Sequence, residues 1–534
     1  MYIRTAVVCL ACVSSASAAT LQVPATGDLQ AAIDAAQPGD VIELEAGAVY
    51  AGNFKLRVKT GSDFIVIRTG GGARELPPAG VRIDRAHAPL LAALRSRNTG
   101  PALATAPGAH HWRIELVEFQ ANAGGQGEII SLGSGTHTDP SHVPSDLVLD
   151  RVYVHGDPVL GQKRGIALNS ASTQIVNSYF EDFKSVGQDS QAICGWNGPG
   201  PYLIENNYSE AAGENVMFGG GTPTIRGMVP SDITVRRNVF TKPLSWRGER
   251  WSVKNAFELK NARRVLIEGN LFEHVWAGGQ NGYAVLFTVR SESGAAPWAV
   301  VEDITFRFNI IRKAGAAINV VGHDDKGASG QVSRLSISNN LVYAIDHGVY
   351  GGNGDFVQLG AQPRDITIER NTVLHTGIAV RLYTGRTPSG TGDVAGFVFR
   401  DNVLRHNQYG VKGEGVNTGL PTFAKFLPGA VFDRNVLAGG PAAQYPAGNY
   451  FPSQVEFEAQ FVNPAAANYA FVAGSMFRTA ASDGGRLGAD LEMMQRVMSG
   501  IARFDAAPAD PGADRDERQP TGRTGRSRSG KRGQ

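Results

Sequence analysis

Hydrophobic and polar residues alternate in short stretches that recur along most of the chain. The pattern apolar-x-apolar-x-x-Asn appears eight times, in segments such as YLIENN, VLIEGN and ITIERN. The asparagines that close these segments are Asn207, Asn238, Asn270, Asn309, Asn340, Asn371, Asn402 and Asn435. Successive spacings are 31, 32, 39, 31, 31, 31 and 33 residues. The sequence therefore contains an internal repeat that has to be explained before any single motif.

Each repeat predicts three short strands and no helix. Apolar residues at every second position indicate a strand before the Asn, another directly after it, and a third about nine residues later, as in ENVMFGG after Asn207. Three short strands per repeat are typical of a parallel β-solenoid. Asn suits the bend between the first two strands because its side chain tolerates left-handed backbone angles, and stacked Asn amides can bond along the solenoid. We therefore assign all eight asparagines to the architecture.

The two ends of the repeat region carry helical patterns. Leu29 and Ile33 lie one helical turn apart, and Pro38-Gly39 follows as a stop signal. Near the other end, apolar residues follow helical spacing, at Leu487, Leu491, Met494, Val497, Ile501 and Phe504. Because repeat proteins need their open ends covered, we expect both segments to be capping helices.

The N-terminal residues predict that the protein is exported. Arg4, an apolar stretch to Val13 and Ala16-Ser17-Ala18 form the pattern of a signal peptide, with lipid attachment at Cys12 as a weaker alternative. We expect five segments. They are 1–19, a signal peptide; 20–110, an N-terminal cap and first coils; 111–480, β-helix repeats; 481–505, a C-terminal capping segment; and 506–534, a disordered basic tail.

Charge and cysteine content exclude several classes of function. The formal net charge of +2 provides no strong field for nucleic acid. No segment after the signal region is long and apolar enough to span a bilayer. Cys194 is the one cysteine of the mature chain, so no intramolecular disulfide forms, and its apolar neighbours indicate a buried side chain rather than a nucleophile. We expect a secreted, periplasmic or extracellular monomer.

The Asn repeat, the three-strand coil and the N-terminal segment GDVIELEAGAVYAGNFKL together resemble a known superfamily. They are similar to the right-handed parallel β-helix proteins that include pectate lyases and related secreted bacterial proteins. The resemblance covers residues 20 to 480 and is more specific for fold than for chemistry. It implies an all-β fold, a single right-handed parallel β-helix with short N- and C-terminal capping helices.

The third strand of the coil carries the candidate chemistry. In NAFELK, alternation places Phe257 and Leu259 inside and Glu258 and Lys260 outside. The neighbouring coils add further outward residues, namely Glu214, Thr288, Arg290, Asn319 and His323. Long insertions flank this strand and would form the walls of a groove over it. Outward residues of successive coils would line a long face, and a face of that shape suits an extended polymer. Tryptophans in the insertions offer faces for sugar rings, at Trp246, Trp251 and Trp298.

The resemblance gives these residues roles in β-elimination at a uronate of an acidic polysaccharide, as in pectate, alginate or chondroitin lyases. Lys260 or Lys254 would be the base and Arg290 the carboxylate clamp, with His323 in the same cluster. Glu214 and Glu258 would be Ca²⁺ ligands or orienting groups. Substrate binding would fall to Trp246, Trp251, Asn319 and Trp298. Lysine serves as a base only where its pKa is lowered.

Other functions remain open on the sequence alone. Outward Glu and Lys on a solenoid are also what a solvated face looks like. The polygalacturonase set of Asn-Thr-Asp, Asp-Asp and Gly-His-Gly is not present, and neither is the Asp-Pro-His signature of mannuronan epimerases. A non-catalytic glycan-binding protein, a structural cell-surface protein and a glycoside hydrolase built on Glu214 and Glu258 are therefore alternatives.

Overall fold

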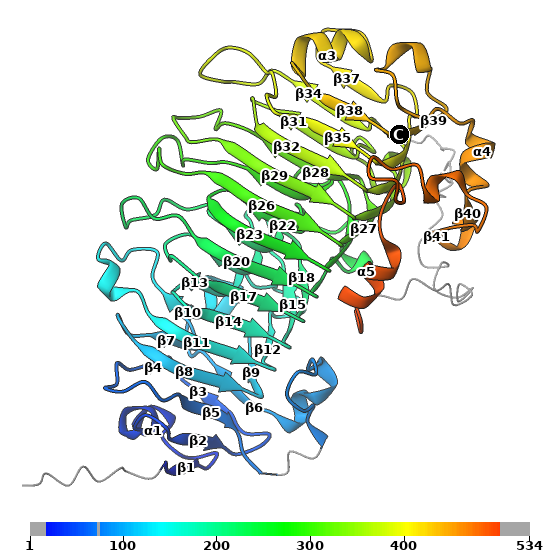
Figure 1. The fold of residues 1–534 in the computed structure, drawn as a ribbon. Helices are drawn as coiled ribbons and strands as arrows, with labels where there is room; N and C mark the ends of the chain where they lie inside the picture. Colours follow the sequence, from blue (N-terminus) through cyan, green and yellow to red (C-terminus); the bar gives the residue numbers. More distant parts are fainter. Residues whose placement is uncertain (1–17, 72–74, 502–534) are drawn as a thin grey trace, which may run out of the picture.

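The computed structural model describes residues 18–71 and 75–501, and its strands wind into one right-handed parallel β-helix (Figure 1). Three long parallel sheets run along the solenoid, with 14, 13 and 12 strands, which we call sheets A, B and C. Each coil contributes one strand to each sheet in the order A, B, C. The predicted fold class is confirmed.

The bounds of the strands follow the predicted repeat. Sheet A contains β1 (Thr20–Val23), β2 (Val41–Leu44), β5 (Ile65–Thr69), β8 (His110–Glu115), β11 (Ser145–Asp150), β14 (Thr173–Val176), β17 (Tyr202–Glu205), β20 (Ser231–Arg236), β23 (Ala262–Glu268), β26 (Val301–Arg307), β29 (Val332–Ser338), β32 (Arg364–Glu369), β35 (Val398–Arg400) and β38 (Val431–Asp433). Sheet B contains β3 (Val49–Ala51), β6 (Ala92–Arg95), β9 (Val117–Phe119), β12 (Tyr153–His155), β15 (Tyr179–Phe183), β18 (Tyr208–Ala211), β21 (Val239–Thr241), β24 (Leu271–Val275), β27 (Ile310–Ala314), β30 (Leu341–Ile345), β33 (Thr372–His375), β36 (Val403–Arg405) and β39 (Val436–Ala438). Sheet C contains β4 (Phe54–Leu56), β7 (Leu103–Thr105), β10 (Glu128–Gly133), β13 (Arg164–Asn169), β16 (Gln191–Gly195), β19 (Glu214–Phe218), β22 (Phe257–Leu259), β25 (Tyr283–Thr288), β28 (Ala316–Val321), β31 (Val357–Gly360), β34 (Val380–Tyr383) and β37 (Val411–Gly413).

The eight asparagines form a hydrogen-bonded ladder inside the bend between sheets A and B. Asn270 is typical: its backbone N–H and its Nδ2 donate to Oδ1 of Asn309, at 2.9 and 3.0 Å. Its own Oδ1 accepts the equivalent bonds from Asn238, at 3.0 and 3.0 Å. All eight side chains are buried, and Asn449 extends the ladder past Asn435 at 2.9 Å. Their structural role is confirmed.

The left-handed residue of this bend is not the asparagine itself. Positive φ angles occur one position earlier, for example at Arg237 (φ 58), Phe308 (φ 54) and Asn339 (φ 55). Tolerance of left-handed backbone angles therefore does not explain the Asn at this position, contrary to the prediction. Asn is placed there by its hydrogen bonds, because its amide offers donors and an acceptor to a buried bend that carries unpaired backbone groups.

Short helices cover the ends of the solenoid. Helix α1 (Leu29–Ala35) begins at Asp28, whose side chain accepts a bond from Ala31 N–H, and buries Leu29 and Ile33 on the first coils, as predicted. At the other end, α3 (Leu420–Phe426) lies beside β37 (Figure 1), and its Phe426 belongs to the hydrophobic core. Two further short helices, α2 (His347–Tyr350) and α4 (Gln454–Glu458), lie outside the coils, as does the hairpin of β40 (Phe461–Asn463) and β41 (Asn468–Phe471).

The C-terminal segment 475–501 returns along the side of the solenoid instead of closing its end. Within it, α5 (Leu491–Val497) is shorter than the apolar stripe predicts. Its Met494 packs on outward residues of sheet B, Val239, Leu271, Ile310 and Leu341. We call residues 475–501 the strap. The tail at 506–534 and most of the predicted signal peptide lie outside the described residues.

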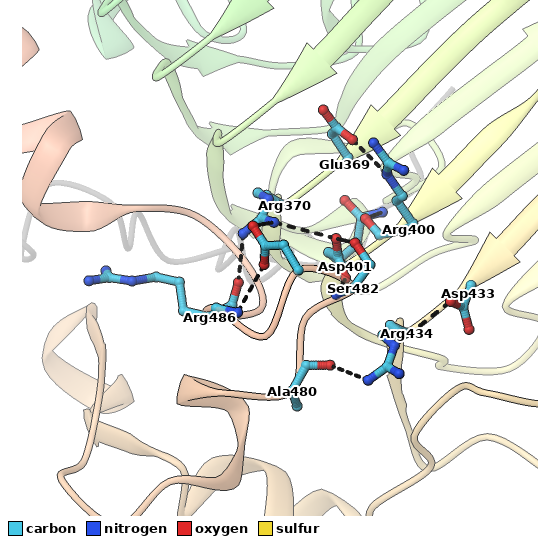
Figure 2. Close-up of polar contacts among 12 residues, drawn as sticks. Glu369, Arg370, Arg400, Asp401, Asp433, Arg434, Ala480, Ser482 and Arg486 are labelled. Atoms are coloured by element: carbon cyan, nitrogen blue, oxygen red, sulfur yellow. Dashed lines mark hydrogen bonds and ion pairs between the residues drawn. The ribbon is translucent and has the colours of Figure 1, made fainter.

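Ion pairs and hydrogen bonds fasten the strap to the A–B bend (Figure 2). Asp401, only 1% exposed, accepts bonds from Ser482 N–H at 2.8 Å and Ser482 Oγ at 2.7 Å. Arg370 pairs with Asp483 at 2.6 Å, and Arg434 Nη1 donates to the carbonyl of Ala480 at 3.3 Å. The strap covers apolar side chains on sheet B that would otherwise face water. Among the described residues, no helix is long and apolar enough to cross a membrane.

Candidate functional site

Sheets A and C use charge differently on their outer faces. On sheet A, carboxylates and guanidinium groups alternate between adjacent coils and pair: Glu205 with Arg236 at 2.9 Å, Glu268 with Arg307 at 2.7 Å, and Glu369 with Arg400 at 2.8 Å. In these pairs the arginines are 44% exposed. Such surface pairs contribute little free energy, and the two charges in each pair already neutralise one another.

On sheet C the outward residues form columns whose register the strand pairing defines. The column through the middle of the sheet runs Cys194, Met217, Glu258, Leu286, Asn319, Gln358, Arg381 and Lys412. The predicted orientation of NAFELK is confirmed, because Phe257 and Leu259 belong to the core while Glu258 is in this outward column.

Two glutamates and two lysines meet on this face, in what we call the Glu–Lys cluster: Glu214, Lys254, Glu258 and Lys260. Lys260 Nζ lies 3.7 Å from a Glu258 oxygen, and Lys254 Nζ lies 4.0 Å from Glu214 Oε1. The glutamate side chains are 0% and 3% exposed, whereas Lys254 and Lys260 are 20% and 16% exposed. The cluster therefore joins a buried negative layer to lysines that reach the surface.

Hydrogen bonds hold both carboxylates in place. Glu258 Oε1 accepts from Thr288 Oγ1 at 2.9 Å, and its Oε2 accepts from Asn255 Nδ2 at 3.1 Å. Gln191 Nε2 donates to Glu214 Oε2 at 2.9 Å. Lys254 makes its shorter ion pair with Asp189, at 2.6 Å. Both glutamates thus keep one orientation at the base of the site.

Burial changes the protonation of the cluster. Desolvation, supported by the charge of Glu258, raises the pKa of Glu214 to about 7. Burial acts to lower the pKa of Lys260, but the carboxylates of Glu258 and Glu214 outweigh it, and the net shift is upward. The requirement that a lysine base have a lowered pKa is therefore not met by the protein alone. At neutral pH Lys260 is an ammonium group.

Two buried oxygens at the cluster have no hydrogen-bond donor, namely Oε1 of Glu214 and Oδ1 of Asn255, whose Nδ2 is bound to Glu258. Carboxylate and amide oxygens are the kind of ligand that Ca²⁺ prefers, so Asn255 joins Glu214 and Glu258 as a candidate ligand of the predicted cation. No group of three or more His, Cys, Asp or Glu side chains suited to a metal occurs within 18–71 and 75–501.

Lys242 supports the cluster from inside the molecule. Its side chain is fully buried, and its ammonium donates to the carbonyls of Ala211 and Gly213 at 2.6 Å each and of Asn255 at 3.1 Å. These carbonyls belong to the segments that carry Glu214 and Lys254. Burial lowers the pKa of Lys242 to about 7. Sequence reasoning missed this residue because nothing in VFTKPLSW distinguishes it from a surface lysine.

Arg290 and His323 lie beyond the cluster. The backbone N–H of Arg290 donates to the carbonyl of Lys260 at 2.9 Å, which places the two residues on adjacent coils as predicted. The Arg290 guanidinium lies 3.6 Å from Asp324 and 3.4 Å from Asp325 and is 30% exposed. His323 is half-buried, burial lowers its pKa, and its buried Nδ1 has no hydrogen-bond partner. It is therefore neutral at pH 7.

The tryptophans offer less free ring surface to a sugar than expected. Trp246 is 5% exposed and packs among Val253, Trp276 and Tyr350, so its ring is not free to stack on a sugar, which corrects that prediction. Trp298 packs against the core, and its Nε1 donates to Met228 O at 3.1 Å. Both rings cover apolar coil surface, because the insertions that carry them fold back onto the solenoid.

Trp251 is partly exposed, and two cationic side chains lie over its ring. Lys184 Nζ lies 5.2 Å and the Arg250 guanidinium 4.8 Å from the ring centroid. Sequence reasoning missed Trp196, which follows β16 and has Arg164 5.1 Å from its ring centroid. Alternation along the strand is the signal that would have found it, two positions past Cys194 on the outward side.

Solved structures support the fold. No protein-family model and no curated protein sequence matches this chain. A mannuronic-acid-specific polysaccharide lyase of family 6 from human gut microbiota has a similar structure, with a TM-score of 0.50 and 12% identity, over 82% of this chain and 92% of that one. The family 6 alginate lyase AlyGC gives a TM-score of 0.51 and 13% identity, and the match spans 91% of this chain but only 59% of AlyGC. These likenesses show a parallel β-helix.

Proposed function

We propose that the protein is an exported, monomeric polysaccharide lyase that cleaves a uronate-containing chain by β-elimination on the outer face of sheet C. The observation that carries the proposal is the Glu–Lys cluster, where two lysines reach the surface above two buried glutamates. The two family 6 lyases that share the fold act on polysaccharides, by their descriptions. Alginate is therefore the first substrate to test, with pectate and glycosaminoglycans after it.

In this proposal, Lys260 is the residue that exchanges the proton. In its neutral form it takes the proton from the carbon next to the sugar carboxylate. The electrons of that C–H bond form the double bond of the product, and the bond to the leaving glycosidic oxygen breaks. The new ammonium then returns the proton to the leaving oxygen, so the step is balanced. Lys254 is less suited to this role because its ammonium is held by Asp189 at 2.6 Å.

Arg290 would neutralise the sugar carboxylate, since a guanidinium can bind a carboxylate through two parallel hydrogen bonds. It is on the coil next to Lys260, and 30% of its side chain is exposed. A Ca²⁺ ion held by Glu214, Glu258 and Asn255 would supply positive charge that offsets the carboxylates and lowers the pKa of Lys260. The ion pairs with Asp324 and Asp325 would limit the orientations of the Arg290 guanidinium.

The test is the ultraviolet absorbance of unsaturated uronate products from alginate, pectate or a glycosaminoglycan, with Ca²⁺ and with a chelator. Lys260→Met should abolish the signal. Lys55→Met is the matched control, because Lys55 is exposed on β4 of the same sheet and lies far from the cluster. Absence of product from all three substrates under both conditions would refute the proposal, and so would full activity of Lys260→Met.

A non-catalytic glycan-binding protein is the second candidate, and the raised pKa of Lys260 favours it. A permanent ammonium binds sugar carboxylates without removing a proton. This function would show as retention on a polysaccharide column without turnover. A glycoside hydrolase has less support, because Glu214 is 0% exposed and cannot reach a glycosidic oxygen.

A further inference from the structure

A second polar network occupies sheet C several coils beyond the Glu–Lys cluster, around Asp355. Asp355 is 0% exposed and accepts four hydrogen bonds. Arg381 donates two, from Nε at 2.5 Å and Nη2 at 3.1 Å. Tyr283 OH donates at 3.1 Å and the backbone N–H of Ile378 at 2.8 Å. A buried carboxylate with this many donors is fully satisfied, so its function is to hold its partners.

Arg381 is the partner that reaches the surface. Its side chain is 34% exposed although two of its nitrogens are bound to Asp355. The guanidinium is thereby fixed in one orientation on the outer face, and little conformational entropy would be lost when it binds a ligand. The ion-paired arginines on sheet A are less firmly held, because their carboxylate partners are partly exposed groups on the adjacent coil.

Arg381 stands in the same outward column as Glu258. The register runs from Glu258 through Leu286, Asn319 and Gln358 to Arg381, which is four coil steps. At about 4.8 Å per step the separation is about 19 Å. The three intervening side chains carry no charge, and Gln358 Nε2 donates to Asn319 Oδ1 at 3.1 Å. Lys412 continues the column on the next coil. A polyanion lying along this column passes the largely buried Leu286, then two amides, and then two cations.

We propose that Arg381, held by Asp355 and Tyr283, is a second carboxylate-binding position, so that the outer face of sheet C takes a long uronate chain laid along the solenoid axis. The inference rests on the acidic polysaccharide of the proposed function and extends it to an internal stretch of polymer. The ligand at this position is the carboxylate of a sugar distant from the one at Lys260. Arginine is suited to it because its planar fork matches a carboxylate.

The experiment measures binding separately from turnover. Affinity for polyuronate is measured in a Lys260→Met background, where no cleavage interferes, at low salt and with chelator. Adding Arg381→Gln should weaken binding of the polymer about tenfold, the effect of losing one charge-assisted hydrogen bond. Arg364→Gln is the matched control, because Arg364 is an exposed, ion-paired arginine on sheet A. It should leave polymer affinity unchanged.

A second variant protects the test against misfolding, since Arg381→Gln leaves the buried charge of Asp355 without its cation. In the double variant Asp355→Asn with Arg381→Gln, both charges are removed together, and polymer affinity should fall by the same factor while the unfolding temperature stays near that of the parent. With Lys260 intact, Arg381→Gln should raise KM for the polymer and leave turnover of a uronate trisaccharide unchanged.

Polymer affinity equal to the parent in both variants would overturn the inference. An equal loss of activity on trisaccharide and polymer would also overturn it, because a position about 19 Å from Glu258 should not affect the shorter substrate. These outcomes are distinct from failure of the proposed function. In that case unsaturated products would be absent while polymer affinity and its dependence on Arg381 would persist.

Discussion

Replacing Glu214 with Gln tests the electrostatics of the site most directly. Glu214 is 0% exposed, and burial raises its pKa to about 7 from an unfolded value of 4.5. A raised folded-state pKa means that the protonated form stabilises the fold. This contribution is complete below pH 4.5 and is lost as the pH rises through about 7. The difference between these two pKa values corresponds to a change of about 3 kcal/mol in the free energy of unfolding.

Glu214→Gln cannot ionise, so the variant does not lose stability as the pH rises. We expect the variant to match the native protein below pH 4.5 and to exceed its free energy of unfolding by up to about 3 kcal/mol above pH 8. With Ca²⁺ present, turnover of polyuronate should fall sharply, because Glu214 is one of the groups that would hold the ion in the proposed function. A gain in stability with a loss of activity is typical of a strained functional site.

The assay is urea unfolding at pH 4.5 and pH 8.5 with chelator present, alongside the absorbance assay. Glu210→Gln is the control, since burial also raises the pKa of Glu210 to about 7 on sheet B, away from the site. Both variants should gain stability at pH 8.5, but only Glu214→Gln should lose activity. Equal free energies of unfolding for native and Glu214→Gln protein at pH 8.5 would refute the reasoning.

Three further predictions concern the base, the ladder and the strap. The rate of polyuronate cleavage should rise toward alkaline pH as Lys260 loses its proton. With chelator present, Glu258→Gln should move this rise to lower pH, because the Glu258 charge raises the pKa of Lys260; an unchanged pH profile would contradict that role of Glu258. Asn309→Ala should cost about 3 kcal/mol in urea unfolding because the donors of Asn270 lose their acceptor; a cost below about 1 kcal/mol would argue against the ladder. Asp401→Ala should make segment 475–501 sensitive to protease without changing turnover; an intact segment would show that its apolar contacts suffice.

The coil could be predicted from the sequence because its determinants are local and repeated. Two-residue alternation selects the inward face of each strand, and an Asn after eight of the sheet A strands marks the bend that follows them. These signals recur eight times, so insertions such as the one before Asn309 do not hide them. The inward and outward assignment of Phe257, Glu258 and Leu259 followed from the same rule and is confirmed.

The partners of the outward residues were decided by the tertiary structure. Insertions of different length separate the strands of sheet C, so sequence distance does not give their register. Glu214 lies 40 residues before Lys254 along the chain, yet the two meet at 4.0 Å. Lys242 and Asp355 gain their roles only through burial beneath neighbouring coils. The raised pKa of Lys260 has the same origin, because it depends on two carboxylates from different coils sharing a dry environment.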